Sequence, residues 1–161
     1  MFVDYNTLPD SARVWVYQSD RKFKVEELPI IQKEAEEFIT NWTRHGDQLK
    51  GSYTVIHNQF LVLAIDESFA NASGCSIDSS VRFVKNIESQ LSVDLMNKLN
   101  ISFKDGDNIN IVSLSDFQEF AKQNKITPDT IVFNNMVQTK GEISNQWEVP
   151  AKDSWHQRFL N

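Results

Sequence analysis

Residues 53–65, YTVIHNQFLVLAI, decide the fold of this chain. Residues 53–57 and 60–65 are rich in β-branched and aromatic side chains, so each segment is predicted to be a β-strand. Asn58 and Gln59 lie between them and form a connection of hairpin length. Because residues 60–65 are apolar throughout, the second strand is expected to be buried on both of its faces.

A helix is predicted on each side of this hairpin. Before it, apolar residues spaced three and four apart run from Leu28 to Trp42, and Gly46 suits a left-handed cap after the helix. After the hairpin, a second apolar stripe runs from Ile77 to Leu91, with Ser76 as the predicted N-cap.

The remaining segments complete an α+β pattern. Strands are predicted at residues 13–18, 100–103, 108–112 and 130–133, and helices at residues 115–124 and near Trp155. Strand, helix, hairpin, helix, strand is the order of a ferredoxin-like βαββαβ core. The sequence therefore predicts one mixed or antiparallel sheet with helices packed on it, a ferredoxin-like core and a C-terminal extension, in a single domain over residues 1–161.

Two aromatic residues of the first strand, Trp15 and Tyr17, point to the same face of the predicted sheet. An aromatic face of this kind is either covered by another part of the chain or used for binding. The C-terminal segment with Trp147 and Trp155 is the expected cover, and a base-stacking platform for RNA is the alternative.

Composition excludes several classes of protein. The 161 residues include 22 acidic residues against 16 Lys and Arg, a net charge of −6, which argues against nucleic acid as a partner. The 11 Phe, 4 Trp and 3 Tyr residues are too many for a disordered chain. Cys75 is the single cysteine, which excludes an intrachain disulfide and a multi-cysteine metal site.

The sequence is expected to carry no targeting signal. Residues 1–5 carry no basic segment followed by an apolar one, as a signal peptide would. The longest aliphatic and aromatic run, residues 60–65, is far too short for a membrane helix. A cytoplasmic protein without membrane contact and without a cofactor is expected.

Three segments carry a resemblance to a known family: LPDSARVWVYQ at residues 8–18, ASGCSIDSS at residues 72–80 and VPAKDSW at residues 149–155. Together they resemble an uncharacterised bacterial family of about this length that is commonly labelled "ABC transporter ATPase". The resemblance extends over essentially the whole chain, and it implies no catalytic residues.

The residues do not support an ATPase activity. Nucleotide-binding domains of this class need a GxxxxGK[ST] phosphate loop, and none of the five glycines is followed by Lys-Ser or Lys-Thr. Asp66 and Glu67 after the apolar strand do imitate a Walker B segment, but the phosphate loop that should precede it is missing.

One segment could carry chemistry. Ser73, Gly74, Cys75, Ser76 and Ser79 lie where a buried strand leads into a helix N-terminus, which attracts anions and activates thiols. The hypothesis is a nucleophilic or redox thiolate at Cys75 beside a small anionic ligand. The alternative is a small buried side chain beside a helix cap, which the acidic residues nearby and the lack of a neighbouring histidine favour.

Asn134 and Asn135 are a second pair of candidate binding residues, because paired amides can recognise amide or carbonyl groups. They are equally explained as turn residues that close a strand. No HxxxH or other paired-ligand spacing predicts a metal site.

The sequence therefore predicts a binding or interaction module whose partner is a small anionic ligand or another protein. A small cysteine-dependent enzyme or thiol sensor at residues 74–76 is the alternative. A homodimer formed through the apolar sheet face is a further expectation.

Overall fold

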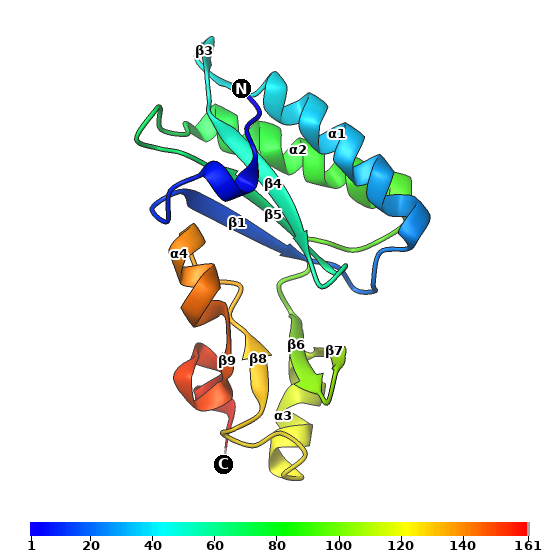
Figure 1. Ribbon diagram of the computed structural model, residues 1–161. Helices are drawn as coiled ribbons and strands as arrows, with labels where there is room; N and C mark the ends of the chain where they lie inside the picture. The colour runs from blue at the N-terminus through cyan, green and yellow to red at the C-terminus, as the bar shows by residue number, and fades with distance from the viewer. Residues whose placement is uncertain (161) are drawn as a thin grey trace. The chain divides into compact units, whose positions relative to one another are not determined.

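The computed structural model describes residues 1–160, and these form two compact units (Figure 1). Unit 1 consists of residues 1–96 together with residues 138–141, and unit 2 consists of residues 97–137 and the described residues from Glu142 onward. Both units combine helices with antiparallel strands, which confirms the α+β class. The expectation of one domain over residues 1–161 stays a prediction.

The sheet of unit 1 contains β1 (Arg13–Gln18), β4 (Gly51–Ile56) and β5 (Phe60–Ile65) in the order β1-β5-β4. All neighbours are antiparallel, and every residue of β5 is buried, as the apolar run predicted. The hairpin between β4 and β5 turns at His57 and Asn58, whose φ angles of 54° and 52° are left-handed. The turn therefore begins one residue earlier than the predicted Asn58–Gln59 connection.

Helices α1 (Leu28–Thr40) and α2 (Gly74–Leu91) cover one face of this sheet (Figure 1). They cover the face that carries Trp15 and Tyr17, since both residues pack into the core that these helices share. The Trp15 ring lies 6.1 Å from the ring of Trp42. The expectation that Trp147 and Trp155 cover this face is therefore wrong, because helices next to the strands in sequence already do so.

The helix ends differ from the predicted ones. Helix α1 ends at Thr40 because residues 43–48 form a small hairpin of β2 (Thr43–Arg44) and β3 (Asp47–Gln48). Gly46 has the expected left-handed φ of 87°, but it lies in this hairpin and not in a helix cap. Within residues 1–160, no helix is both long enough and apolar enough to cross a bilayer.

An ion pair lies within the segment before α1, and its arginine also bonds to the end of α2. Arg21 donates hydrogen bonds of 2.8 and 2.9 Å to both carboxylate oxygens of Glu27 and a third of 2.7 Å to the carbonyl of Leu91. Glu27 ends the short 3₁₀ helix η2 (Val25–Glu27) and is buried. The guanidinium lowers the pKa of Glu27 to about 2.

Unit 2 has its own sheet, in the order β7-β6-β8-β9. Its elements are β6 (Asn100–Asp105), β7 (Asn108–Ser113), α3 (Leu114–Lys122), β8 (Ile131–Phe133), the π-helix η3 (Ile143–Trp147), β9 (Glu148–Pro150) and the 3₁₀ helices η4 (Ala151–Asp153) and η5 (Trp155–Phe159). The short helix α4 (Lys140–Glu142) begins in unit 1 and ends at the first residue of this part of unit 2. The ferredoxin-like core is not confirmed, because the strand after α2 pairs with β7 and β8 and not with β1 or β5.

Helix α3 and η5 pack against the sheet of unit 2 around Phe117 and His156. His156 is fully buried, its ring stacks on Trp155 at 3.8 Å, and its Nδ1 lies 2.7 Å from the hydroxyl of Ser154. Within the described residues, Nε2 of His156 has no hydrogen-bond partner. Burial of the ring lowers the pKa of His156 to about 4.

Candidate functional site

The structure places the predicted cluster around Cys75 at the N-terminus of α2. Ser73 is the N-cap, and its hydroxyl accepts a 3.2 Å hydrogen bond from the backbone N–H of Ser76. The Ser76 hydroxyl is buried and donates to the carbonyl of Thr43 at 2.9 Å, while Ser79 donates to the carbonyl of Cys75. These hydroxyls therefore stabilise the start of the helix, one turn earlier than the predicted N-cap at Ser76.

Cys75 itself is exposed and next to Gly74, which is exposed as well. Among the described residues, none forms a hydrogen bond with the Cys75 thiol, and no group of three or more His, Cys, Asp or Glu side chains could hold a metal ion. The expectation of a small buried side chain is therefore wrong, because the first turn of α2 turns this position to solvent. A thiolate mechanism therefore gains an accessible sulfur, but within the described residues no base is hydrogen-bonded to it.

Because Cys75 is exposed, we expect the native protein to react with one equivalent of a disulfide reagent such as DTNB without denaturant. The Cys75→Ser variant is the control and should release no chromophore. A rate well above that of a short cysteine peptide would support the thiol-enzyme alternative. A native protein that does not react would contradict the exposed position of the side chain.

Asn134 and Asn135 lie in unit 2, at the turn after β8. Asn135 Oδ1 accepts a 2.9 Å hydrogen bond from Nε1 of the buried Trp147, and Asn134 Oδ1 accepts one of 3.2 Å from the backbone N–H of Met136. The structure brings both asparagines together, but the side-chain carbonyl of Asn134 is used within the turn and that of Asn135 by Trp147 of η3. The Cys75 cluster belongs to unit 1, so the two sets of candidate residues lie in different units.

A groove of about 680 Å³ runs along the outer edge of β4, between α1 and the N-terminal segment. We name it the β4 groove. Its lining includes Phe2, Val25, Leu28, Glu36, Tyr53 and Val55. Val25 is 81% exposed, so one end of the β4 groove offers an apolar side chain to solvent.

Strand β4 is an edge of the sheet, and its backbone is only partly paired there. Gly51 exchanges two 3.0 Å hydrogen bonds with the N-terminal segment, through the carbonyl of Met1 and the N–H of Val3. Because alternate residues of a strand direct their backbone groups to the same side, Tyr53 and Val55 also direct theirs outward. Within residues 1–160, no strand pairs with this edge beyond Gly51.

After this contact the N-terminal segment no longer pairs with β4, although it stays beside the strand as a short 3₁₀ helix. Asp4 caps the short 3₁₀ helix η1 (Tyr5–Thr7), and its carboxylate accepts a 2.9 Å hydrogen bond from the N–H of Asn6. Phe2 stays behind with its ring 6.2 Å from that of Tyr53. The β4 groove therefore begins where the chain's own pairing with β4 stops.

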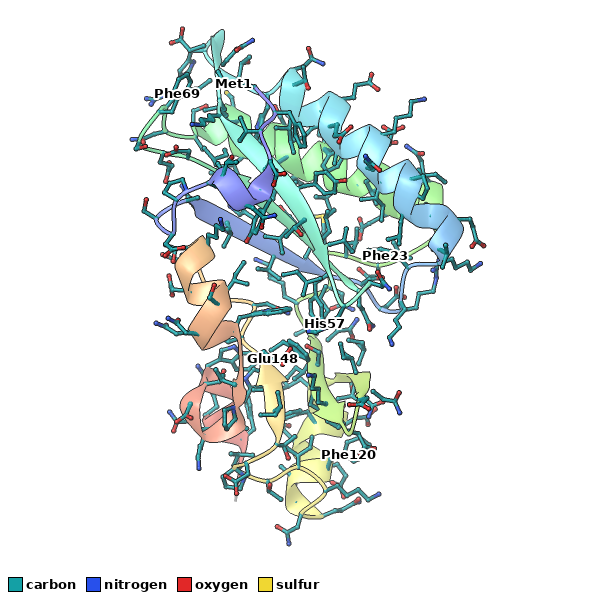
Figure 2. All side chains as sticks on the ribbon, in the orientation of Figure 1. Met1, Phe23, His57, Phe69, Phe120 and Glu148 are labelled. Carbon is teal, nitrogen blue, oxygen red and sulfur yellow. The ribbon has the colours of Figure 1, made fainter. Side chains whose placement is uncertain are left out.

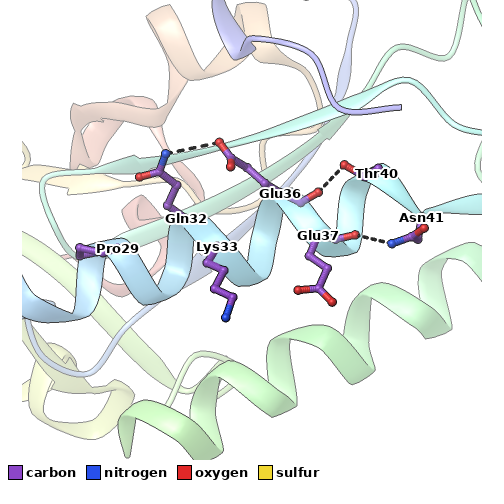
Figure 3. A pocket seen from close by; sticks show the side chains of 7 residues that line it. All are labelled: Pro29, Gln32, Lys33, Glu36, Glu37, Thr40 and Asn41. Carbon is purple, nitrogen blue, oxygen red and sulfur yellow. Dashed lines mark hydrogen bonds between the residues drawn. The ribbon is translucent and has the colours of Figure 1, made fainter.

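Acidic side chains give the β4 groove its charge. Asp4 and Glu36 line it, and no Lys or Arg of the described residues does. Gln32 and Glu36 project from α1 on the β4 side, whereas Lys33 and Glu37 project toward α2 (Figure 3). Burial raises the pKa of the Tyr53 hydroxyl, and the negative charge of Glu36 raises it further, so the carboxylate acts on the floor of the groove.

No family model, no curated protein and no solved structure matches this chain. The resemblance to the bacterial family labelled as an ABC transporter ATPase therefore stays a prediction.

Sequence reasoning missed the β4 groove. Its floor was visible only as a strand with Tyr53 and Val55 on one face and polar Ser52 and Thr54 on the other. The usable signal was that residues 52–55 contain no Lys and no Pro, the residues that usually protect an edge strand. That signal has meaning only once the strand is known to lie at the edge.

Proposed function

We propose that this chain is a binding module that takes an extended polypeptide segment into the β4 groove as an added strand. The observation that carries the proposal is the outward-facing backbone of Tyr53 and Val55, next to a groove that a helix closes on one side. A cytoplasmic location, and neither nucleic acid nor a membrane as partner, belong to the same proposal.

Extended segments bind other proteins by adding to an open sheet edge, where backbone hydrogen bonds supply affinity and side-chain pockets supply selectivity. Exposed edges are otherwise protected by charges, Pro or bulges, because an open edge pairs with any available strand. Residues 53–55 carry none of these, and Phe2 already makes one parallel bridge to Gly51 on this edge. Beyond Gly51, this edge therefore has no strand of the described residues paired with it and is able to accept one.

Hydrogen exchange of the full-length protein tests the proposal, with short extended peptides of mixed sequence as probes. We expect the amides of Tyr53 and Val55 to exchange quickly in the free protein and at least about tenfold more slowly when peptide is bound. The amides of Ser52 and Thr54 face β5 and are the internal control, because they should be slow in both states.

Peptide N-methylation supplies the matched ligand control. A methyl group on an amide that faces β4 should abolish the protection, whereas one on the next amide along should not, because alternate amides face opposite ways. Equal effects at both positions, or peptide binding that leaves Tyr53 and Val55 unprotected, would contradict strand addition.

A further inference from the structure

We infer that the segment bound in the β4 groove carries a cationic side chain at the residue paired with Tyr53 and an apolar side chain at the residue paired with Val55. This inference rests on the proposed function and names the chemical class of its ligand. Tyr53 and Val55 are two residues apart on β4, so their side chains both point to the α1 side of the sheet, and the side chains of the residues paired with them point to the same side.

The alignment of α1 with β4 places Glu36 beside Tyr53. A β-carbon built on Gly51 would lie 3.4 Å from Cγ2 of Ile39, so the start of β4 lies next to the end of α1. Two strand residues advance about 6.6 Å and four helix residues about 6 Å, and α1 runs antiparallel to β4. Tyr53 therefore lies level with the helical turn that carries Glu36, in agreement with the effect of Glu36 on the Tyr53 hydroxyl.

The same alignment places apolar side chains beside Val55. Four strand residues from Gly51 advance about 13 Å, which reaches the first turns of α1. Leu28 begins α1, Val25 precedes it in η2, and both line the β4 groove. An aliphatic side chain paired with Val55 would bury apolar surface against them, including that of the exposed Val25.

Charge favours a cationic peptide over a second copy of this chain. The β4 groove contains Asp4 and Glu36 as its charged side chains within the described residues, and the whole chain carries a net charge of −6. Two copies joined edge to edge through β4 would bring these like charges together. A basic segment removes that repulsion and gains an attraction that is weakest at high salt.

The test uses fluorescent peptides of seven residues, with arginine, threonine and isoleucine at the centre and serine on both sides. Both orders of the central three residues are included, because the strand can add in either direction. Anisotropy should show that one order binds about fivefold to tenfold more tightly than the matched peptide in which glutamate replaces arginine. Binding of the better peptide should weaken as the salt concentration rises.

Two charge reversals on α1 locate the effect. Glu36→Lys should lower the affinity for the arginine peptide about tenfold and raise the affinity for the glutamate peptide. Glu37→Lys changes the net charge equally but projects toward α2, so it should change either affinity less than about twofold at 0.15 M salt. Circular dichroism of both variants should match the parent chain, since Glu37 is exposed and Glu36 is only half-buried.

The outcomes separate the inference from the function on which it rests. Equal affinity for arginine and glutamate peptides, with Tyr53 and Val55 still protected, would overturn the inference and leave strand addition standing. No peptide protection at β4 would overturn both. A dimer whose β4 edge is protected in the absence of peptide would show that a second copy occupies the groove, and would overturn the inference.

Discussion

Replacing Trp42 with alanine is expected to lower the free energy of unfolding of unit 1 by about 3–5 kcal/mol. Trp42 is 2% exposed and packs against the rings of Trp15 and Phe38, at centroid distances of 6.1 and 4.9 Å. Its Nε1 also donates a buried 2.9 Å hydrogen bond to the carbonyl of Ser76 in α2. The substitution removes the ring that joins the end of α1 to the sheet and to α2. Urea denaturation of the full chain measures the change.

Two further variants show how much of the stability lost in Trp42→Ala comes from packing and how much from the hydrogen bond. Trp42→Phe keeps most of the packing but removes the donor to Ser76, so a smaller loss of about 1–3 kcal/mol is expected. Phe69→Ala removes an aromatic ring that is 53% exposed in the loop before α2 (Figure 2), and it should change stability by less than about 0.5 kcal/mol. A loss below about 1 kcal/mol for Trp42→Ala would contradict the packing described for this ring.

Lowering the pH from 7 to 4 is expected to reduce the stability of unit 2 by about 3 kcal/mol through His156. The folded pKa of His156 is about 4, below the ordinary value of 6.5 that applies to the unfolded chain. Between these values the unfolded state binds the proton and the folded state does not, so stability is full above pH 6.5 and falls as the pH falls toward 4. About 2 kcal/mol should already be lost at pH 5.

Urea titrations at pH 7 and pH 5, followed by resolved NMR signals of β6 and β8, measure this loss. His156→Gln should remove most of the pH dependence, whatever it costs at pH 7. His45→Gln replaces an exposed histidine of unit 1 and is the matched control, which should leave the pH dependence of unit 2 unchanged. An NMR titration of the His156 ring with a pKa near 6.5 would contradict the prediction.

Much of the fold of unit 1 was predictable because its signals are local. The apolar run at residues 60–65 identified β5, and the periodic residues Ile31 and Ala35 lie on the buried face of α1, together with Ile39, which the periodicity did not single out. The partners of the strands were less predictable, because pairing joins residues that are distant in sequence. Nothing local at residues 100–105 distinguishes a strand that joins β5 from one that starts a second sheet.

The candidate site was harder to predict than the fold. Serines around Cys75 drew attention because hydroxyls at a helix N-terminus suit both a ligand and a cap, and the hydrogen bonds of Ser73 and Ser76 are those of a cap. The β4 groove depends on which strand lies at the edge and which helix lies beside it. Glu36 and Tyr53 are too far apart in sequence for any local pattern to connect them.

The two units do not follow one another in the sequence. Residues 138–141 belong to unit 1, where the N–H of Val14 bonds to the carbonyl of Gln138 and Nζ of Lys140 donates to the carbonyl of Leu8. A ribosome therefore releases most of unit 2 before it supplies the last piece of unit 1. During synthesis the edge of β1 therefore has no partner there until residues 138–141 have left the ribosome.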